Sequence, residues 1–335
     1  MMDNKTWFSQ GNFGMMIHFG LYSLLAGEHN GKQGTGIDES YHGEWIQHRA
    51  RIPNAEYERL ATVFNPIYFN SDEWVKRAKD AGMNYMVVTS KHHDGFALFD
   101  TKWDNYNCVT GSPFKRDIIG EIANSCAKYG LKLGLYYSQE MDWHEKDGGG
   151  YGYATNDWDF PDRKEKNFTR YFEGKMKTQI KELLTNYGDI CLIWCDNPVE
   201  ITEAQSIELY NMIKHCQPDC LVNSRIGNGI GDYRSCGDNF INVDREQLEA
   251  TPDVINARSM EYLVGSRTGL YECPATTGKS WGYVTYDTYK TAEEIKATKD
   301  RLTSMGVNYL LNVGPDGLGR FPVPVLNIFN DLIEK

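Results

Sequence analysis

Asp196 is the carboxylate of this sequence that is best placed to do chemistry. It directly follows the apolar run from Ile190 to Cys195, which has the composition of a buried strand. A carboxylate at such a point is costly unless it lies at a mouth that solvent can reach. There it could act as a nucleophile on the anomeric carbon of a sugar. The alternative is a turn former or helix cap ahead of Asn197 and Pro198.

A carboxylate nucleophile of this kind needs a second carboxyl group about 5–5.5 Å away, and that group must keep its proton near neutral pH. The downstream candidates are Asp232, Asp238 and Glu272. Glu272 lies in an apolar-flanked stretch, where burial would raise its pKa. Asp238 lies in a polar loop, which favours an ionised group or a turn former. We therefore expect Glu272 as the acid/base, with Asp238 as the second candidate.

Other polar side chains end other apolar runs, namely His18, His92, His93, Tyr136 and Arg225. Neutral imidazoles each offer one donor and one acceptor, which suits sugar hydroxyl groups. The three histidines could instead hold zinc, although neighbouring residues of a strand face opposite sides unless a bulge intervenes. Arg225 could orient a carboxylate or bind a hydroxyl group, or it could form only a surface salt bridge.

These residues must be positioned by a recurring unit in which an apolar run precedes an amphipathic helix. The runs span 15–20, 85–96, 131–138, 190–196, 220–226 and 308–315, and the helices 71–82, 116–130, 166–187, 202–216 and 291–306. Expected N-caps are Ser71, Thr202 and Thr291, and Gly130 and Gly306 are expected helix stops.

Six or more such units predict an α/β fold, a (β/α)8-like TIM barrel forming one domain over 1–335. The polar residues would then share the rim at the carboxyl ends of the strands. Residues 227–290 are rich in Gly, Asp and Ser and have poor periodicity. We therefore expect the barrel to be irregular there.

The amino-acid composition limits the classes of molecule that this protein can bind. The net charge of −11 disfavours nucleic acid and anionic membranes, because both require clustered Lys and Arg, so a neutral substrate is expected. No apolar run reaches the ~18 residues needed to span a membrane. The first ten residues lack the pattern of a signal peptide, and we expect a cytoplasmic protein whose eight cysteines are reduced.

Taken together, the motifs resemble glycoside hydrolase family 29, the retaining α-L-fucosidases. The resemblance rests on GMMIHFGLYS (14–23), HGEW (42–45), SKHHDGFALF (90–99), FKRDIIGE (114–121), GLYYS (134–138), LIWCD (192–196), NSR (223–225), YECPATTGKSWGY (271–283) and GVNYLLNVGPDGLG (306–319). It covers nearly the whole chain in the family's order.

The resemblance implies hydrolysis of terminal α-L-fucosyl residues from oligosaccharides or glycoconjugates, without metal or other cofactor. It assigns the nucleophile to Asp196. It assigns fucose binding to His18, Glu44, Trp45, His92, His93, Tyr136, Trp194, Arg225 and Trp281. The tryptophans could form an apolar wall for the 6-methyl group of fucose, although core packing is the commoner use of a tryptophan.

The sequence departs from the family pattern at two places. Where many members carry a glutamate after a GDY motif, this chain has Gly237, with Asp238 next to it. The acid/base thus stays open between Glu272 and Asp238, and a catalytically impaired fucose-binding protein is the alternative reading. A metal-dependent barrel hydrolase is a further one. We also expect no separate C-terminal β-sandwich, and a homo-oligomer that covers the surface such a domain would cover.

Overall fold

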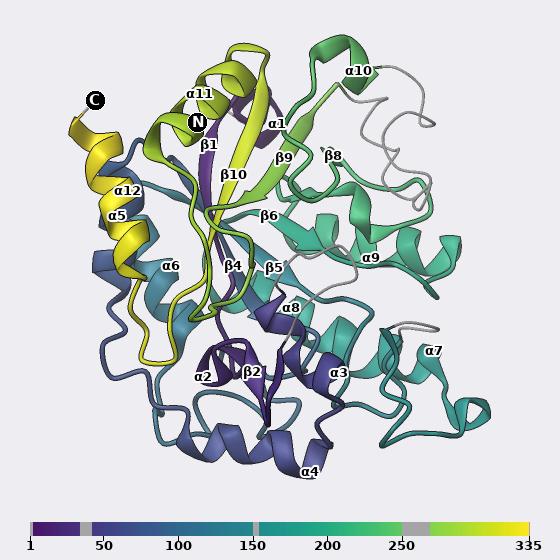
Figure 1. Ribbon diagram of the computed structural model, residues 1–335. Coiled ribbons are helices and arrows are strands. Elements are labelled where there is room, and N and C mark those ends of the chain that lie inside the picture. The colour runs from purple at the N-terminus through teal and green to yellow at the C-terminus, as the bar shows by residue number, and fades with distance from the viewer. Residues whose placement is uncertain (1–2, 34–41, 150–153, 250–268, 335) are drawn as a thin grey trace.

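Eight parallel strands form the centre of the molecule (Figure 1). The computed structural model describes residues 3–33, 42–149, 154–249 and 269–334. The sheet consists of β1 (Phe13–Ile17), β4 (Tyr85–Lys91), β5 (Lys132–Tyr137), β6 (Ile190–Cys195), β7 (Leu221–Val222), β8 (Arg234–Ser235), β9 (Tyr271–Thr276) and β10 (Val307–Val313). Their order is β7-β6-β5-β4-β1-β10-β9-β8, so neighbours in the chain are neighbours in the sheet.

The two ends of this sheet meet. A parallel bridge joins Asn223, just after β7, to Tyr233, just before β8. The Ser224 amide donates to the Tyr233 carbonyl over 2.8 Å, and the Asp232 amide donates to the Val222 carbonyl over 2.7 Å. With this closure, the strands form the predicted (β/α)8 barrel.

Helices surround the strands, and α5, α6 and α12 lie together on one side (Figure 1). The helices are α1 (Asn4–Phe8), α2 (Tyr22–Leu25), α3 (Ile46–Ala50), α4 (Asn54–Tyr57), α5 (Ser71–Asp80), α6 (Ile118–Tyr129), α7 (Phe168–Tyr171), α8 (Lys177–Asn186), α9 (Glu203–Cys216), α10 (Arg245–Glu249), α11 (Ala292–Ser304) and α12 (Val323–Glu334). A small antiparallel hairpin, β2 (Glu28–His29) with β3 (Lys32–Gln33), lies outside the barrel. None of the described helices has the length and apolar character needed to cross a membrane.

Helix boundaries follow the capping residues in most cases. Thr202 and Thr291 each form a complete capping box, and α6 ends at Gly130, whose φ of 74° is left-handed. The prediction for Ser71 was wrong, because Asn70 caps α5 by accepting the Glu73 amide at 3.2 Å. Ser71 is the first helical residue, and its hydroxyl group accepts a hydrogen bond from Ser125.

Two further predictions needed correction. The helix expected over 166–187 is divided, since a π-helical turn, η5 (Phe172–Met176), separates α7 from α8. Strands β8 and β9 lie in the region with poor periodicity and were not identified as apolar runs. β8 has only two residues, and β9 contains Glu272 and Pro274, so neither has the continuous apolar pattern by which the other strands were found. Residues 250–268 of that region lie outside the described part of the chain.

The barrel interior is filled from its amino-terminal end upward by large side chains. Trp7 and Phe8 of α1 pack against Tyr85 and Tyr233, with ring centroids 5.4 and 4.4 Å apart. Gly14 is needed on β1, since a Cβ atom there would lie 2.3 Å from the Tyr85 ring. Among the described residues, the amino-terminal end of the barrel interior is thus filled by packed side chains.

Replacing Thr291 with alanine should destabilise α11. The hydroxyl of Thr291 accepts the Glu294 amide, and the Glu294 carboxylate accepts the Thr291 amide in return. Loss of such a cap costs about 1 kcal/mol, or roughly 2 °C in Tm for a chain of this size, measured by thermal unfolding. The control is Thr298→Ala in the same helix, which removes no cap and should not lower Tm. Equal Tm values for the two variants would contradict the assignment.

Candidate active site

Asp196 lies at the carboxyl end of β6, directly after the last strand residue, Cys195. One carboxylate oxygen, Oδ2, accepts the Tyr136 hydroxyl at 2.9 Å, and the other, Oδ1, accepts Arg225 Nη1 at 2.9 Å. Its backbone amide donates to Oε1 of Gln139 over 2.6 Å. The side chain is 11% exposed, so the carboxylate is held firmly but can still be reached from the rim.

The surroundings of Asp196 act in opposite directions on its pKa. Burial raises the pKa, and the nearby carboxylate of Asp238 raises it further, whereas the Arg225 charge and the hydrogen bonds from Arg225 and Tyr136 lower it. The net pKa lies above the ordinary value of an aspartate. The positive charge and the hydroxyl donor therefore favour the ionised form that a nucleophile needs.

Arg225 joins two carboxylates. While Nη1 binds Asp196, Nη2 binds Oδ1 of Asp238 and donates to the Cys236 carbonyl over 3.1 Å. The guanidinium carbon lies 4.5 Å from the centroid of the Trp194 ring, within range of a cation–π contact. Arg225 thus contacts both carboxylates at this rim, and that it orients them for a reaction stays a prediction. The Asp238 side chain is 47% exposed, so it faces the open side of the rim.

Glu272 occupies a different level of the barrel. It is the second residue of β9, near the amino end of the strand, and is fully buried. Its Oε1 accepts the indole N–H of Trp194 at 2.8 Å, and Oε2 accepts the Tyr85 hydroxyl at 2.9 Å. Burial raises the pKa of Glu272 to about 7, as its apolar flanks predicted. Both of its oxygens are therefore occupied by residues of the barrel interior.

The predicted histidines gather beside Asp196. The rings of His18 and His92 lie 5.5 Å apart, and those of His92 and His93 lie 4.0 Å apart. Both members of the adjacent pair can reach the same site because they follow β4, which ends at Lys91, so the alternation of side chains along a strand no longer separates them. His93 Nε2 lies 3.7 Å from Asp196 Oδ2.

The three histidines are neutral near pH 7, because burial lowers the pKa of each of them. The Nδ1 atom of His18 lies 2.7 Å from Oδ1 of Asn312, whose amide nitrogen donates to the Trp281 carbonyl. This network assigns the proton of His18 to Nδ1 and leaves Nε2 as an acceptor. Within the described ranges, no three His, Cys, Asp or Glu side chains are grouped as metal ligands.

Aromatic rings enclose the histidines. Trp281 lies 5.2 Å from His18, and Trp45 lies 5.1 Å from His93, measured between ring centroids. Glu44 is buried next to Trp45, and its carboxylate accepts the Gly282 amide at 2.7 Å. Burial alone would raise the pKa of Glu44. The lowering contributions, of which the hydrogen bond and the charge of His42 are the largest, outweigh burial, and the net pKa is lowered. The Glu44 carboxylate is thus a charged hydrogen-bond acceptor among uncharged aromatic rings. This combination suits a sugar, which has hydroxyl groups and apolar faces.

Two further residues of this site, Trp143 and Gln139, were not predicted from the sequence. Trp143 packs on His93 and on Trp45, each at 5.4 Å between centroids. Gln139 binds the backbone of Asp196 and also donates to the Arg225 carbonyl over 2.9 Å. Both residues follow β5 and lie at the same rim as Tyr136. Their position just after a predicted strand could have identified them as site residues.

The family model for alpha-L-fucosidase matches residues 2–332. The alpha-L-fucosidase of Dictyostelium discoideum is 28% identical over 94% of this chain, and the tissue alpha-L-fucosidase of Bos taurus is 27% identical over 93%. The chain spans 66% and 63% of the length of these two relatives.

A solved structure of similar size also matches. It is alpha-L-fucosidase AlfC from Lactobacillus casei in complex with alpha-L-fucose, which is 46% identical with a TM-score of 0.87. The match covers 99% of this chain and 98% of that one. A mutant of AlfC in complex with Fuca(1,6)GlcNAc is likewise 46% identical, with a TM-score of 0.86 over 98% of this chain and 97% of that one.

Substitution of Tyr136 by phenylalanine should raise the pKa of Asp196 further, since it removes a hydrogen bond that stabilises the carboxylate. At a given acidic pH, a smaller fraction of Asp196 would then be ionised. The pKa can be followed by NMR titration of protein labelled with carbon-13 at the aspartate carboxyl groups. The control is Tyr309→Phe, a buried tyrosine of β10 that packs on Phe13. An Asp196 pKa that stays the same or falls in Tyr136→Phe would contradict this electrostatic account.

Proposed function

Because the chain belongs to the α-L-fucosidase family, we propose that it is a retaining exo-α-L-fucosidase that removes terminal α-L-fucosyl units from oligosaccharides or glycoconjugates. The observation that carries the proposal is Asp196, a carboxylate held by Tyr136 and Arg225 at the carboxyl rim of the barrel. The AlfC complex with Fuca(1,6)GlcNAc makes that disaccharide the first oligosaccharide substrate to test.

In the first step, an oxygen of Asp196 attacks the anomeric carbon of the fucosyl unit and the glycosidic C–O bond breaks. The departing oxygen takes a proton from the acid/base residue, and a covalent fucosyl ester of Asp196 forms. In the second step, the acid/base residue removes a proton from water, which attacks the same carbon and releases L-fucose. Two inversions leave the anomeric configuration unchanged.

Asp238 is the proposed acid/base in preference to Glu272. Its carboxylate shares one guanidinium with Asp196 and is half exposed, as a group that must meet a leaving oxygen and a water molecule should be. A shared guanidinium fits the short spacing, about 5–5.5 Å, of a retaining pair. Glu272 has a pKa suited to an acid, but it is fully buried and binds Tyr85 and Trp194. Its proposed role is to hold Trp194 under the guanidinium.

The remaining side chains bind the sugar. His18, His92 and His93 offer neutral donors and acceptors to the hydroxyl groups, and Glu44 accepts from one of them. Trp281 and Trp45 contact the apolar faces, and a 6-hydroxyl group would lose its water of hydration against such rings. The reaction so described is carried by side chains alone, with no step through a metal ion.

Two further proposals concern the protein as a whole. All eight cysteines are free and seven of them are buried, which supports a reducing, cytoplasmic location.

The apolar side chains of Tyr68 and Leu318 are exposed on two segments that lie next to each other. The segments are joined by a hydrogen bond from the Tyr68 amide to the Leu318 carbonyl. This surface supports a homo-oligomer. Light scattering at micromolar concentration tests the proposal, and a monomeric mass would contradict it.

The test is hydrolysis of p-nitrophenyl α-L-fucoside by wild type, Asp196→Ala, Asp238→Ala and Glu272→Ala, each with and without azide. Asp196→Ala should lose several orders of magnitude in kcat. Asp238→Ala should lose on the order of 10²–10⁴-fold and regain turnover with azide, which needs no base. Asp300→Ala, a surface carboxylate of α11 paired with Lys296, is the matched control and should behave as wild type.

Each outcome of this series discriminates between assignments. Rescue of Glu272→Ala alone would transfer the acid/base role to Glu272. Normal activity of folded Asp196→Ala would eliminate the nucleophile assignment. A folded wild type that binds L-fucose but turns over no fucoside would replace the proposal by a fucose-binding protein, the alternative raised by Gly237.

A further inference from the structure

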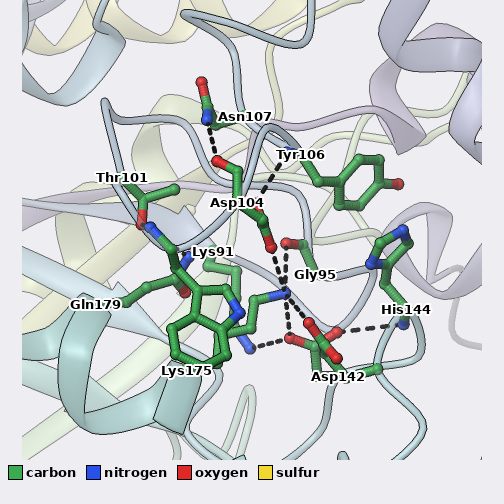
Figure 2. Close-up of polar contacts among 12 residues, drawn as sticks. Lys91, Gly95, Thr101, Asp104, Tyr106, Asn107, Asp142, His144, Lys175 and Gln179 are labelled. Atoms are coloured by element: carbon green, nitrogen blue, oxygen red, sulfur yellow. Dashed lines mark hydrogen bonds and ion pairs between the residues drawn. The ribbon is translucent and has the colours of Figure 1, made fainter.

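A buried ion cluster is formed by Lys91, Asp142 and Lys175 (Figure 2). Lys91 directly precedes the histidine pair in the chain. Asp142 Oδ2 lies 3.1 Å from the Nζ atom of each lysine and accepts the Tyr171 hydroxyl at 3.2 Å. The side chains of all three charged residues are at most 1% exposed. None of them was singled out in the sequence, and none contributes to the reaction described above.

Such a cluster needs a reason beyond stability. Transfer of each charge from water into the interior costs several kcal/mol, and apolar residues of similar volume often stabilise a core equally well. Buried ion pairs do, in some proteins, fix one arrangement of the segments they join. The segments joined here are therefore the informative feature.

Both ends of the Lys91–Asp142 pair adjoin residues of the sugar site. Lys91 ends β4 and is followed by His92 and His93, and Asp142 is followed by Trp143. The Trp143 amide donates to the His93 carbonyl over 2.7 Å. The ion pair thus ties together the two backbone segments whose rings, His93 and Trp143, pack at 5.4 Å.

Lys175 reaches the cluster from outside the barrel, from the π-helical turn η5. Its ammonium group lies 3.3 Å from a carboxylate oxygen of Glu145 and 3.6 Å from one of Asp104. It also lies 3.5 Å from the carbonyl of Gly95, in the turn that follows the histidines (Figure 2). Gly95 has a φ of 78°, and a Cβ atom there would lie 2.4 Å from Asp142 Oδ1. The carboxylate is therefore packed directly against the histidine turn. Single π-helical turns often mark functional positions.

His93 connects the segment held by the ion cluster to Asp196, the reacting carboxylate. Its Nδ1 atom lies 2.7 Å from the Ser138 hydroxyl, and its Nε2 atom lies 3.7 Å from Asp196 Oδ2. A small movement of the 91–95 turn would thus change both the binding of the sugar and the surroundings of the nucleophile.

We propose that Asp142, held between Lys91 and Lys175, is a positioning residue that fixes His93 and Trp143 against the bound fucosyl unit. This inference rests on the proposed function and adds to it a device that couples helix packing outside the barrel to the sugar site.

The test removes the outer lysine. Lys175→Met keeps the Lys91–Asp142 pair and removes the ion pairs of Lys175 with Glu145 and Asp104, whose carboxylates are partly exposed. Methionine is long enough to fill the space. We expect the Kd for L-fucose and the KM for p-nitrophenyl α-L-fucoside to rise on the order of tenfold, because small misplacements of binding groups are costly. Lys175→Arg, which keeps the charge and its donors, should restore both values. Lys177→Met, at the surface of α8 and paired with Glu173 and Glu208, is the control and should match wild type.

The outcomes separate positioning from mere stability. If Lys175→Met lowers Tm but keeps the wild-type Kd and KM, the inference is overturned. If Lys175→Met does not fold, Asp142→Glu decides, since it keeps the charge but moves the carboxylate against Gly95. A wild-type Kd in that variant overturns the inference, and a raised Kd supports it. A wild type that neither binds L-fucose nor cleaves the fucoside would instead defeat the proposed function itself.

Discussion

The arrangement of the site depends on one guanidinium group. Arg225 binds Asp196 and Asp238 through different nitrogens and lies over Trp194. Two neighbouring carboxylates repel each other and raise each other's pKa, and a positive charge between them offsets part of that rise. The planar, permanently charged fork of an arginine can bind both at once, which a lysine ammonium group cannot do with the same geometry. The tryptophan beneath it is fixed in turn by Glu272.

Barrel closure brings this arginine into position. β7 has only two residues, and the chain then turns so that Asn223 bridges to Tyr233. The side-chain amide of Asn223 donates to the Cys195 carbonyl and accepts the Cys195 amide, both at 2.9 Å. The Asn223 side chain thereby makes the two hydrogen bonds to the Cys195 backbone that the main chain of a neighbouring strand would otherwise make, directly before Asp196. The short strand and its side-chain pairing together place Arg225 against the nucleophile.

The sequence was informative where one physical signal dominated. Six strands were predicted because continuous apolar runs are the mark of a buried parallel strand, and their carboxyl ends indicated the rim that Asp196, His18, His93 and Arg225 share. Strands β8 and β9 were missed because polar and proline residues interrupt them. The position of Glu272 along the barrel axis could not be predicted either. Its apolar neighbours in the sequence indicate that it is buried, but not how far it lies from the rim. The burial of Lys175 could not be predicted, because a lysine in a helical segment is almost always exposed.

The proposed double displacement requires that Asp196 becomes covalently bound to the sugar. A 2-deoxy-2-fluoro-α-L-fucosyl fluoride slows the second step more than the first, so the intermediate should accumulate and can be identified by mass spectrometry of peptides. The account predicts one fluorofucosyl group per active site, attached to the peptide that contains residues 190–196 and located on Asp196. A label on Asp238 or Glu272, or normal consumption of the reagent with no labelled peptide, would contradict it.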